Sequence, residues 1–135
     1  MREETAVDGF RAVPTHRAVG DALARIEALA RARGMTIFAQ LDFSGDASRA
    51  GLELKPMGLI ILGNPKAGTA LLAAAPTVGV DLPLKVLAWE DAQGRTWLGY
   101  NEAEYLQRRH RFPAELTKNI AALAALVEAA AASGS

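Results

Sequence analysis

Apolar residues recur at helix-like and strand-like spacing along the chain, and these patterns predict its first elements. Apolar residues among polar neighbours in residues 5–13 predict a first strand. Pro14 is expected to end that strand, and the hydroxyl of Thr15 can cap the first turn of a helix. One face of this helix is marked by apolar positions four, three and three residues apart, namely Val19, Leu23, Ile26 and Leu29. Gly34 is a suitable residue to end it.

The middle of the chain contains two apolar runs of strand-like length. Residues 35–41 predict the second strand, and the uninterrupted run 59–62 predicts a third strand covered on at least one face. Between them, residues 44–51 are small and polar, which predicts a loop or a short helical turn. Asn64 and Pro65 have the residue types of an N-cap and a first helical position, so a helix is expected from there to about Ala75.

The last part of the chain predicts a β-hairpin followed by two helices. Residues 84–90 and 96–100 flank the turn 91–94, in which Gly94 supplies a positive φ. A short helix is expected over 102–110. The final helix has an apolar face at Leu116, Ile120, Leu123 and Val127. The order is therefore β-α-β-β-α-β-β-α-α, which predicts an α+β fold in which helices pack on a mixed or antiparallel sheet. We expect a single domain over residues 1–132 and a disordered tail at 133–135.

Composition and charge exclude several classes of function. The chain has 135 residues, half of them apolar, with 15 basic and 15 acidic side chains. This balance argues against a protein that binds nucleic acid by neutralising phosphates. The absence of cysteine rules out disulfides and thiolate chemistry. No apolar run is long enough for a membrane span, and the N-terminus lacks a secretory signal, so a cytoplasmic protein without membrane contact is expected.

Residues 63–69 join a strand to a helix and are the first candidate site. Lys66 and Thr69 lie near the expected helix N-terminus, where a carboxylate or phosphate can be held. The segment lacks the glycine spacing and the final Gly-Lys-Ser/Thr of a nucleotide-binding loop. The alternative interpretation is a strand-to-helix turn with no ligand.

Charged residues after position 80 are the second group of candidates. Asp81 is expected to cap the backbone or to pair with Lys85, and both roles are structural. Glu90 and Asp91 are expected to be solvated turn residues, and they do not form an acid/base pair because successive strand side chains face opposite ways.

Histidine supplies the other candidate chemistry. His110 is expected near the end of a helix, where its charged form is favoured by the helix dipole, and His16 in the first turn of the first helix. Two histidines so far apart do not form a metal motif, so no metal or cofactor is assigned. A Ser-His-Asp triad is possible by inventory, but no Gly-x-Ser-x-Gly elbow is present.

Several segments together resemble domain-of-unknown-function family 302. The specific pieces are Gly-Asn-Pro-Lys at 63–66 and Asp-Leu-Pro-Leu-Lys at 81–85. The resemblance covers most of the chain through these positions: Gly34, Phe38, Asp42, 50–52, Leu54, 62–69, 76–77, 81–87, 89–91, Gly94, Trp97, 100–101, 105–106 and 109–110. It implies a small α+β protein that associates as a dimer, with no established activity.

The resemblance also implies a shared pocket near Asp42, 64–66 and Asp81. One departure concerns the residue after Asp42. Many family members have an Asp-His pair there, whereas this chain has Phe43. If that histidine transfers a proton or binds a metal in relatives, this protein lacks the group, although the carboxylate of Asp42 remains.

The leading hypothesis is a homodimeric small-molecule-binding domain with a polar pocket. The candidate ligand-binding residues are Asp42, Asn64, Pro65, Lys66, Thr69, Asp81, Lys85, Tyr100 and His110. One alternative is an enzyme of unknown reaction in which Asp42 or His110 acts as acid or base and Lys66 as an electrostatic anchor. The other is a structural or interaction module in which Gly63, Pro65, Gly68 and Pro83 serve only the backbone.

Overall fold

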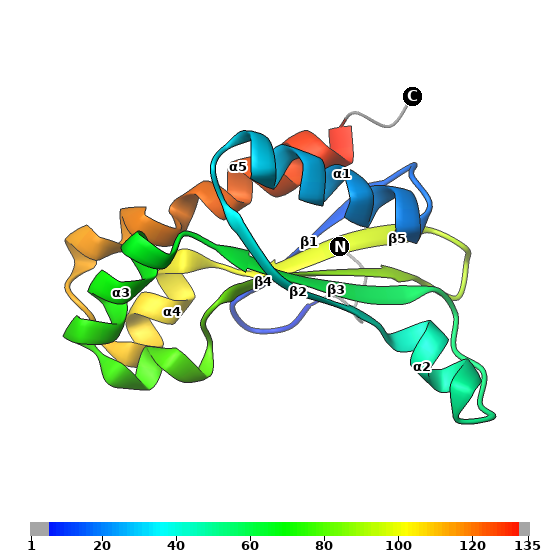
Figure 1. Cartoon of the computed structure of the whole chain (residues 1–135), viewed down its shortest axis with the longest axis horizontal. Coiled ribbons are helices and arrows are strands. Elements are labelled where there is room, and N and C mark those ends of the chain that lie inside the picture. Colours follow the sequence, from blue (N-terminus) through cyan, green and yellow to red (C-terminus); the bar gives the residue numbers. More distant parts are fainter. Residues whose placement is uncertain (1–5, 133–135) are drawn as a thin grey trace.

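A five-stranded antiparallel sheet forms the centre of the protein (Figure 1). The structure is a computed structural model that describes residues 6–132. The strands lie in the order β1-β5-β4-β3-β2, so β1 and β2 form the two edges. Their bounds are β1 Phe10–Thr15, β2 Thr36–Asp42, β3 Met57–Gly63, β4 Leu84–Glu90 and β5 Thr96–Asn101. Every pairing is antiparallel, which confirms the predicted α+β class.

Helices cover one face of the sheet and one of its ends. In Figure 1, α1 and α5 lie together over one face, α3 and α4 stand at one end, and α2 extends from the other end. The helices are α1 Val19–Ala32, α2 Phe43–Arg49, α3 Pro65–Ala74, α4 Ala103–His110 and α5 Lys118–Ala132, with short 3-10 helices η2 Pro76–Val80 and η3 Ala114–Thr117. Within residues 6–132, none of the helices is long and apolar enough to cross a membrane.

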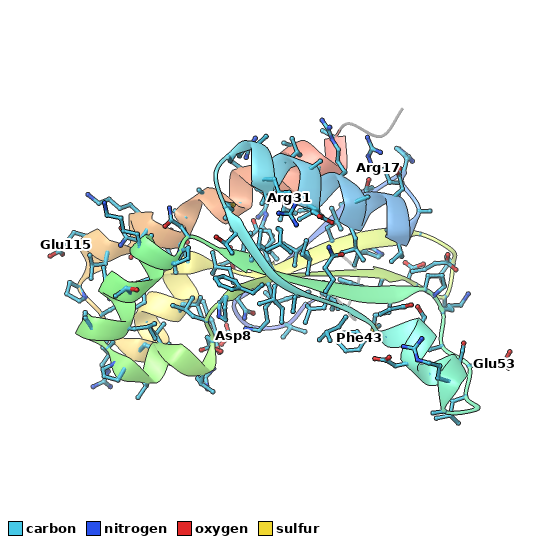
Figure 2. The ribbon with its side chains drawn as sticks, in the orientation of Figure 1. Asp8, Arg17, Arg31, Phe43, Glu53 and Glu115 are labelled. Atoms are coloured by element: carbon cyan, nitrogen blue, oxygen red, sulfur yellow. The ribbon has the colours of Figure 1, made fainter. Side chains whose placement is uncertain are left out.

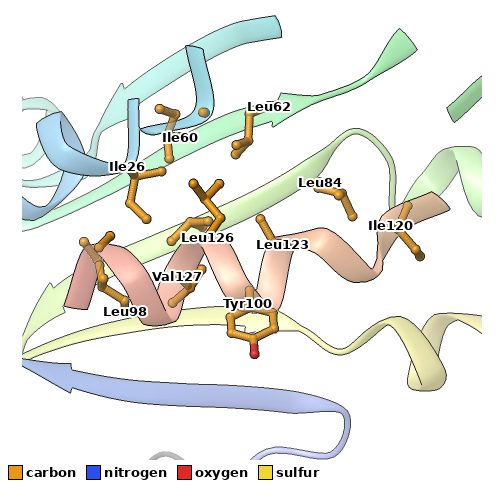
Figure 3. Close-up of a cluster of buried hydrophobic side chains, with 14 of the residues drawn as sticks. Ile26, Ile60, Leu62, Leu84, Leu98, Tyr100, Ile120, Leu123, Leu126 and Val127 are labelled. Atoms are coloured by element: carbon orange, nitrogen blue, oxygen red, sulfur yellow. The ribbon is translucent and has the colours of Figure 1, made fainter. Parts of the chain in front are cut away.

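The main core lies between the sheet and the pair α1 and α5. Ile60 and Leu62 of β3 point into it and are fully buried, as are Ile26 of α1 and Leu126 of α5 (Figure 3). Alternate residues of a strand face opposite sides, so Leu59 and Ile61 point to the other face of the sheet. They are half-buried there. The run 59–62 is therefore apolar on both faces, although α1 and α5 cover only one.

The uncovered face of the sheet is largely apolar as well. The cross-strand register places Leu41 of β2 beside Leu59, Leu59 beside Leu87 of β4, and Leu87 beside Gly99 of β5. The ring of Phe10 lies directly over Gly99, where any Cβ would collide with it. Leu41 remains 40% exposed, and Leu87 is half-buried. We call this surface the open face, defined by Phe10, Leu41, Leu59, Ile61, Leu87, Trp89 and Trp97.

Several predicted local structures are confirmed. The side chain of Asn64 caps α3, because its Oδ1 accepts hydrogen bonds from the backbone N–H groups of Lys66 and Ala67 at 3.0 and 3.3 Å. Pro65 is the first residue of that helix. Gly94 has a φ of 79° in the hairpin turn, as predicted.

The start of the first helix differs from the prediction. Thr15 is the last residue of β1 and does not cap the helix. Its hydroxyl donates a hydrogen bond to the backbone oxygen of Ala131 in α5, a contact between residues far apart in sequence. The helix begins at Val19 after Ala18, and His16 lies before it. Pro14 is accepted within β1 because β1 is an edge strand.

The segment after β2 forms a helix of seven residues, which the sequence suggested only as a loop or short turn. Its first turn is stabilised by Asp42, whose Oδ1 accepts from the backbone N–H of Gly45 at 2.9 Å. The expected tail at 133–135 lies outside the described residues.

Candidate functional site

A cavity of about 450 Å³ opens where β3 ends and α3 begins. Its walls come from α3, from α5, from the η2–β4 connection and from the start of β2. Most of the lining is apolar, contributed by residues such as Met35, Phe38, Leu72, Leu82 and Leu123. Antiparallel pairing of Thr36 with Gly63 brings the start of β2 next to the end of β3, which is how these segments come together.

Hydrogen bonds of three side chains fix the cavity wall. The cap by Asn64 determines where α3 starts, as described above. Asn119 of α5 donates through Nδ2 to the backbone oxygen of Ala67 in α3 at 3.2 Å, which joins the two helices across the cavity. Thr69 donates its hydroxyl to the backbone oxygen of Pro65 at 2.7 Å. The polar groups of Asn119 and Thr69 are therefore partly used in holding the wall.

Of the predicted site residues, Asn64, Pro65 and Thr69 line this cavity. Lys66 follows Pro65 on α3 and is exposed, but it is not part of the lining. Arg33, at the C-terminal end of α1, and Asn119 also line the cavity, although no motif in the sequence singles them out. Arg33 follows the last residue of α1 and Asn119 lies in the first turn of α5, and only the packing of α1, α3 and α5 brings them to this place.

A second polar cluster lies behind the cavity wall. Asp81 accepts a hydrogen bond from Nη1 of Arg109 at 3.0 Å and lies 2.5 Å from Nε2 of His110. The other ring nitrogen of His110, Nδ1, is 2.9 Å from the hydroxyl of Thr77. Only 4% of the His110 side chain is exposed. We call Thr77, Asp81, Arg109 and His110 the clasp, because they join α4 to η2 and to the start of β4.

The clasp positions part of the cavity wall. Leu82 and Pro83 directly follow Asp81, and Gly79 lies between Thr77 and Asp81. Gly79, Leu82 and Pro83 all line the cavity. Fixing Asp81 and Thr77 against α4 therefore fixes the wall. The sequence singled out Asp81 and His110 separately, but not their contact, because they are 29 residues apart.

Lys85 does not pair with the carboxylate of Asp81. Its Nζ donates instead to the backbone oxygens of Asp81 at 3.3 Å and Pro83 at 2.8 Å. Burial lowers the pKa of Lys85, and the charge of Asp81 opposes part of that shift. Lys85 lies on β4 beside Ile61, outside the cavity lining. These contacts give hydrogen-bond partners to two backbone oxygens of the loop that leads into β4.

Asp42 and Tyr100 lie away from the cavity. Asp42 is the last residue of β2 and pairs with Gly58 at the start of β3, whereas Asn64 follows the end of β3. The structure thus separates Asp42 from Asn64 and Asp81, and the expected single pocket does not form. The backbone N–H of Gly45 holds the pKa of Asp42 below its usual range, with help from Ser44. Phe43, where relatives often have His, begins α2 beyond this end of the sheet (Figure 2).

Tyr100 points into the main core beneath α5 (Figure 3). It is 5% exposed, and burial raises the pKa of its hydroxyl above the ordinary value. Within residues 6–132, no group of three or more His, Cys, Asp or Glu side chains is arranged to hold a metal ion.

The hairpin turn holds a buried carboxylate that the sequence interpretation placed in solvent. Asp91 is 5% exposed and accepts from the backbone N–H groups of Gln93 and Arg95, each at 2.9 Å. It also accepts from the indole nitrogen of Trp97 at 2.9 Å. The expectation that Asp91 is a solvated turn residue is therefore wrong. The cause is Trp97, which turns back over the hairpin and needs an acceptor.

Comparison with known proteins places the sequence in a family. Residues 11–130 match the family described as domain of unknown function DUF302. Three curated relatives, named fluoride-specific ion channels FluC 1 of Brucella suis, FluC 1 of Brucella abortus and FluC 2 of Brucella melitensis, are 41% identical over 102 residues, which is 76% of this chain. The chain spans 38–40% of the length of these relatives.

A solved structure shares the fold. The crystal structure of an uncharacterized conserved protein DUF302 from Bacillus stearothermophilus superposes with a TM-score of 0.75 at 19% sequence identity. The superposition covers 93% of this chain and 97% of that one. The likeness shows that the sheet and its helices are common to both proteins.

Proposed function

The chain belongs to the DUF302 family, and we propose that it is a small-molecule-binding domain that works as a homodimer. The cavity between α3, α5 and the end of β3 carries this proposal. Ligand sites of small domains are typically clefts of about 300–1,000 Å³ with apolar walls and a few fixed polar groups. The cavity has a volume of about 450 Å³, and its polar groups are Arg33, Asn64, Thr69 and Asn119.

The rigidity of the cavity supports binding. Asn119 joins α5 to α3, and the clasp fixes the segment that carries Leu82 and Pro83. A site whose walls are already held in place loses less conformational entropy when a ligand enters. The polar residues predicted from the sequence as ligand contacts thus have two roles. Asn64 and Thr69 line the cavity, whereas Asp81 and His110 belong to the clasp that supports its wall.

The open face supports a homodimer. It presents Leu41, Leu59, Ile61 and Leu87 side by side, and such contiguous apolar surface is typical of a protein interface. A second copy placed face to face would cover the same patch on both partners, as two-fold symmetry requires. Polar α2 and the charged residues Lys85 and Glu90 near the two ends of β4 would form its rim.

The curated relatives also favour a binding role. They are named as ion channels, and the matched segment makes up 38–40% of each. A small domain with its own core and cavity, present as a minor part of a channel protein, suits a module that senses a ligand and regulates the remainder.

The binding proposal can be tested with an uncharged fluorescent probe, N-phenyl-1-naphthylamine. Ala122 of α5 lines the cavity and is exposed, so Ala122→Trp places an indole inside it. We expect this variant to weaken binding of the probe at least about tenfold, because the added ring occupies the space. Ala125→Trp on the same helix, which is exposed outside the cavity lining, is the matched control and leaves binding unchanged. Equal binding by both variants would place the probe elsewhere and contradict the proposal.

The clasp favours a second candidate, an enzyme in which His110 is the acid or base. A hydroxyl, an imidazole and a carboxylate in hydrogen-bonded sequence are the arrangement that activates a nucleophile, and the hydroxyl of Thr77 is on an exposed residue. Asp42 is less suited to this role, because its carboxylate caps α2. Hydrolysis of p-nitrophenyl acetate distinguishes the candidates: an enzyme of this kind loses about 100-fold or more in rate with Thr77→Val, whereas a binding domain shows no rate above that of buffer.

A further inference from the structure

We propose that the cavity binds an amphipathic carboxylic acid, with the apolar part of the molecule inside and its carboxylate between Arg33 and Asn64. This inference rests on the proposed binding function and names the class of its ligand. Three properties of the cavity lead to it: the sign of the charge in its lining, the orientation of an amide group, and the depth of apolar wall beneath them.

The charge of the lining is positive. Arg33 lines the cavity, and the lining contains no aspartate or glutamate. Among the ion pairs formed within residues 6–132, none involves Arg33, whereas Arg31 two positions earlier is paired with Glu27 at 3.0 Å. A guanidinium without a protein anion presents a fork of N–H donors that matches a carboxylate. A cationic ligand would be repelled here and would find no counter-charge.

The amide of Asn64 is oriented by the helix that it caps. Its Oδ1 accepts from two backbone N–H groups at the start of α3, which fixes the oxygen toward the helix. The Nδ2 group therefore points away from those two donors, and it donates no hydrogen bond to another residue of the described chain. The amide assignment follows from the donors that surround the oxygen. Asn64 thus offers a donor to the cavity.

The remaining polar groups do not change this balance. Thr69 has already donated its hydroxyl to the backbone of Pro65, and Asn119 has donated Nδ2 to Ala67. The oxygens of these two side chains can still accept a hydrogen bond from a hydroxyl or amide of a ligand, but they carry no charge. The positive charge of Arg33 and the Nδ2 donor of Asn64 therefore favour a ligand with a negatively charged acceptor next to them. Lys66 is exposed between the lining residues Pro65 and Ala67, and it adds to the positive potential.

The apolar wall determines the other end of the ligand. Leu72 of α3, Leu82 and Leu84 before and within β4, and Ile120 and Leu123 of α5 form a continuous surface. A small carboxylate such as acetate would leave this apolar surface in contact with water, so the surface would contribute little to the binding free energy. An aliphatic or aromatic body attached to the carboxylate would cover it, at about 25 cal/mol for each Å² of apolar surface removed from water.

Four probes separate the contributions of head and tail: decanoate, decanol, decylamine and acetate, each titrated calorimetrically into the full chain. We expect decanoate to bind roughly 10- to 100-fold more tightly than decanol, which is the range for a hydrogen-bonded charge. Decylamine and acetate should bind too weakly to measure. Decanol or decylamine binding as tightly as decanoate would overturn the inference while leaving a ligand site in place.

Two variants assign the effect to Arg33. Arg33→Met keeps the aliphatic stem and should reduce the preference for decanoate over decanol to about one, with decanol binding unchanged. Arg31→Met is the matched control, since Arg31 lies in the last turn of α1, two residues before Arg33 (Figure 2), and is paired with Glu27 outside the cavity lining. It should retain the full preference. Loss of preference in both variants would assign the effect to general charge and overturn the carboxylate site.

The outcomes also distinguish this inference from the function on which it rests. If none of the three ten-carbon probes binds and the naphthylamine probe is insensitive to Ala122→Trp, the cavity is no ligand site and both proposals fail. If the naphthylamine probe is displaced from the cavity by decanol and not by decanoate, the binding function stands and the carboxylate inference alone is wrong.

Discussion

The two faces of the sheet are built from the same kind of residue and differ in what covers them. On β3, Ile60 and Leu62 are fully buried under α1 and α5, whereas Leu59 and Ile61 on the opposite side are half-buried. Hydrophobic side chains of equal size therefore contribute unequally to the stability of one chain. The covered face determines the fold, and the open face retains apolar surface that only another molecule can bury. This difference can be tested one residue at a time.

The largest expected effect is in the covered face. Leu126 of α5 is fully buried against Ile26 and Ile60 (Figure 3). Leu126→Ala should lower the free energy of unfolding by about 3–5 kcal/mol, because the transfer energy is lost and a cavity remains. Leu87→Ala on the open face should cost only about 1–2 kcal/mol, since its side chain is half-exposed in one chain. Urea unfolding at a concentration low enough to prevent self-association measures both. Equal losses would mean that the two faces contribute equally within one chain.

The second effect concerns the aromatic end of the open face. Trp97 is 5% exposed although no helix of the described chain lies over it, because Trp89 stacks beside it at 6.4 Å and Arg95 lies over its ring at 5.6 Å. Asp91 accepts its indole N–H together with two backbone donors. Asp91→Ala should therefore destabilise the fold by about 2–3 kcal/mol, as expected when buried donors lose a charged acceptor.

Asp46→Ala provides the comparison for Asp91. Asp46 is an exposed residue of α2 that pairs with Arg49. Its loss should change the free energy of unfolding by less than about 1 kcal/mol, the usual range for a surface ion pair. A loss at Asp46 as large as that at Asp91 would contradict the role assigned to the buried carboxylate.

The third effect is on association. Leu59 lies in the middle of the open face, between Leu41 and Leu87. If a second copy covers this face, Leu59→Lys should weaken dimerisation at least about 30-fold, or roughly 2 kcal/mol, by placing an unpaired charge in the interface. Sedimentation velocity measures the dissociation constant, and circular dichroism verifies that the sheet is retained.

Leu52→Lys is the matched control for Leu59. Leu52 follows α2, is 66% exposed and lies outside the sheet. The same change of leucine to lysine there should leave association unaltered. A wild-type chain that stays monomeric at its highest soluble concentration would refute the dimer, and equal weakening by both variants would place the interface elsewhere.

The sequence predicted those parts of the molecule that depend on neighbours along the chain. Asn64 and Pro65 start a helix because a cap and a fixed φ act within one turn, and Gly94 turns the hairpin for the same kind of local reason. The apolar run 59–62 predicted a central strand covered on at least one face, which leaves open whether one chain covers both. Whether a second face is covered depends on how distant segments pack, and the residues next to the strand do not determine this.

The errors and omissions involve partners that are distant in sequence. Thr15 has the residue type of a cap, but its hydroxyl bonds to Ala131 at the other end of the chain. Asp91 has the residue type of a solvated turn residue, but the indole of Trp97 donates a hydrogen bond to its carboxylate and Asp91 is buried. The candidate site was predicted in pieces for the same reason. Asn64 was found from its local motif, whereas Arg33 has no motif and reaches the cavity only through the packing of α1.

The smallest expected effect is a pH dependence in the covered face. Burial raises the pKa of Tyr100 in the folded chain above the ordinary value of 10.0. As pH rises past 10, the unfolded chain releases this proton first, so the folded chain binds more protons and stability falls with pH. The contribution is fully present below pH 10 and is lost progressively above it.

Tyr100→Phe removes that titration. The free energy of unfolding of the wild type, minus that of Tyr100→Phe, should be constant from pH 7 to 9 and decline above pH 10. Urea titrations of both proteins at each pH measure this difference, and the titrations of the other tyrosine and of the lysines cancel within it. A difference that is constant or rises above pH 10 would mean that the core under α5 does not resist the phenolate. The covered face would then be less enclosed than the burial of Leu126 and Val127 beside it indicates.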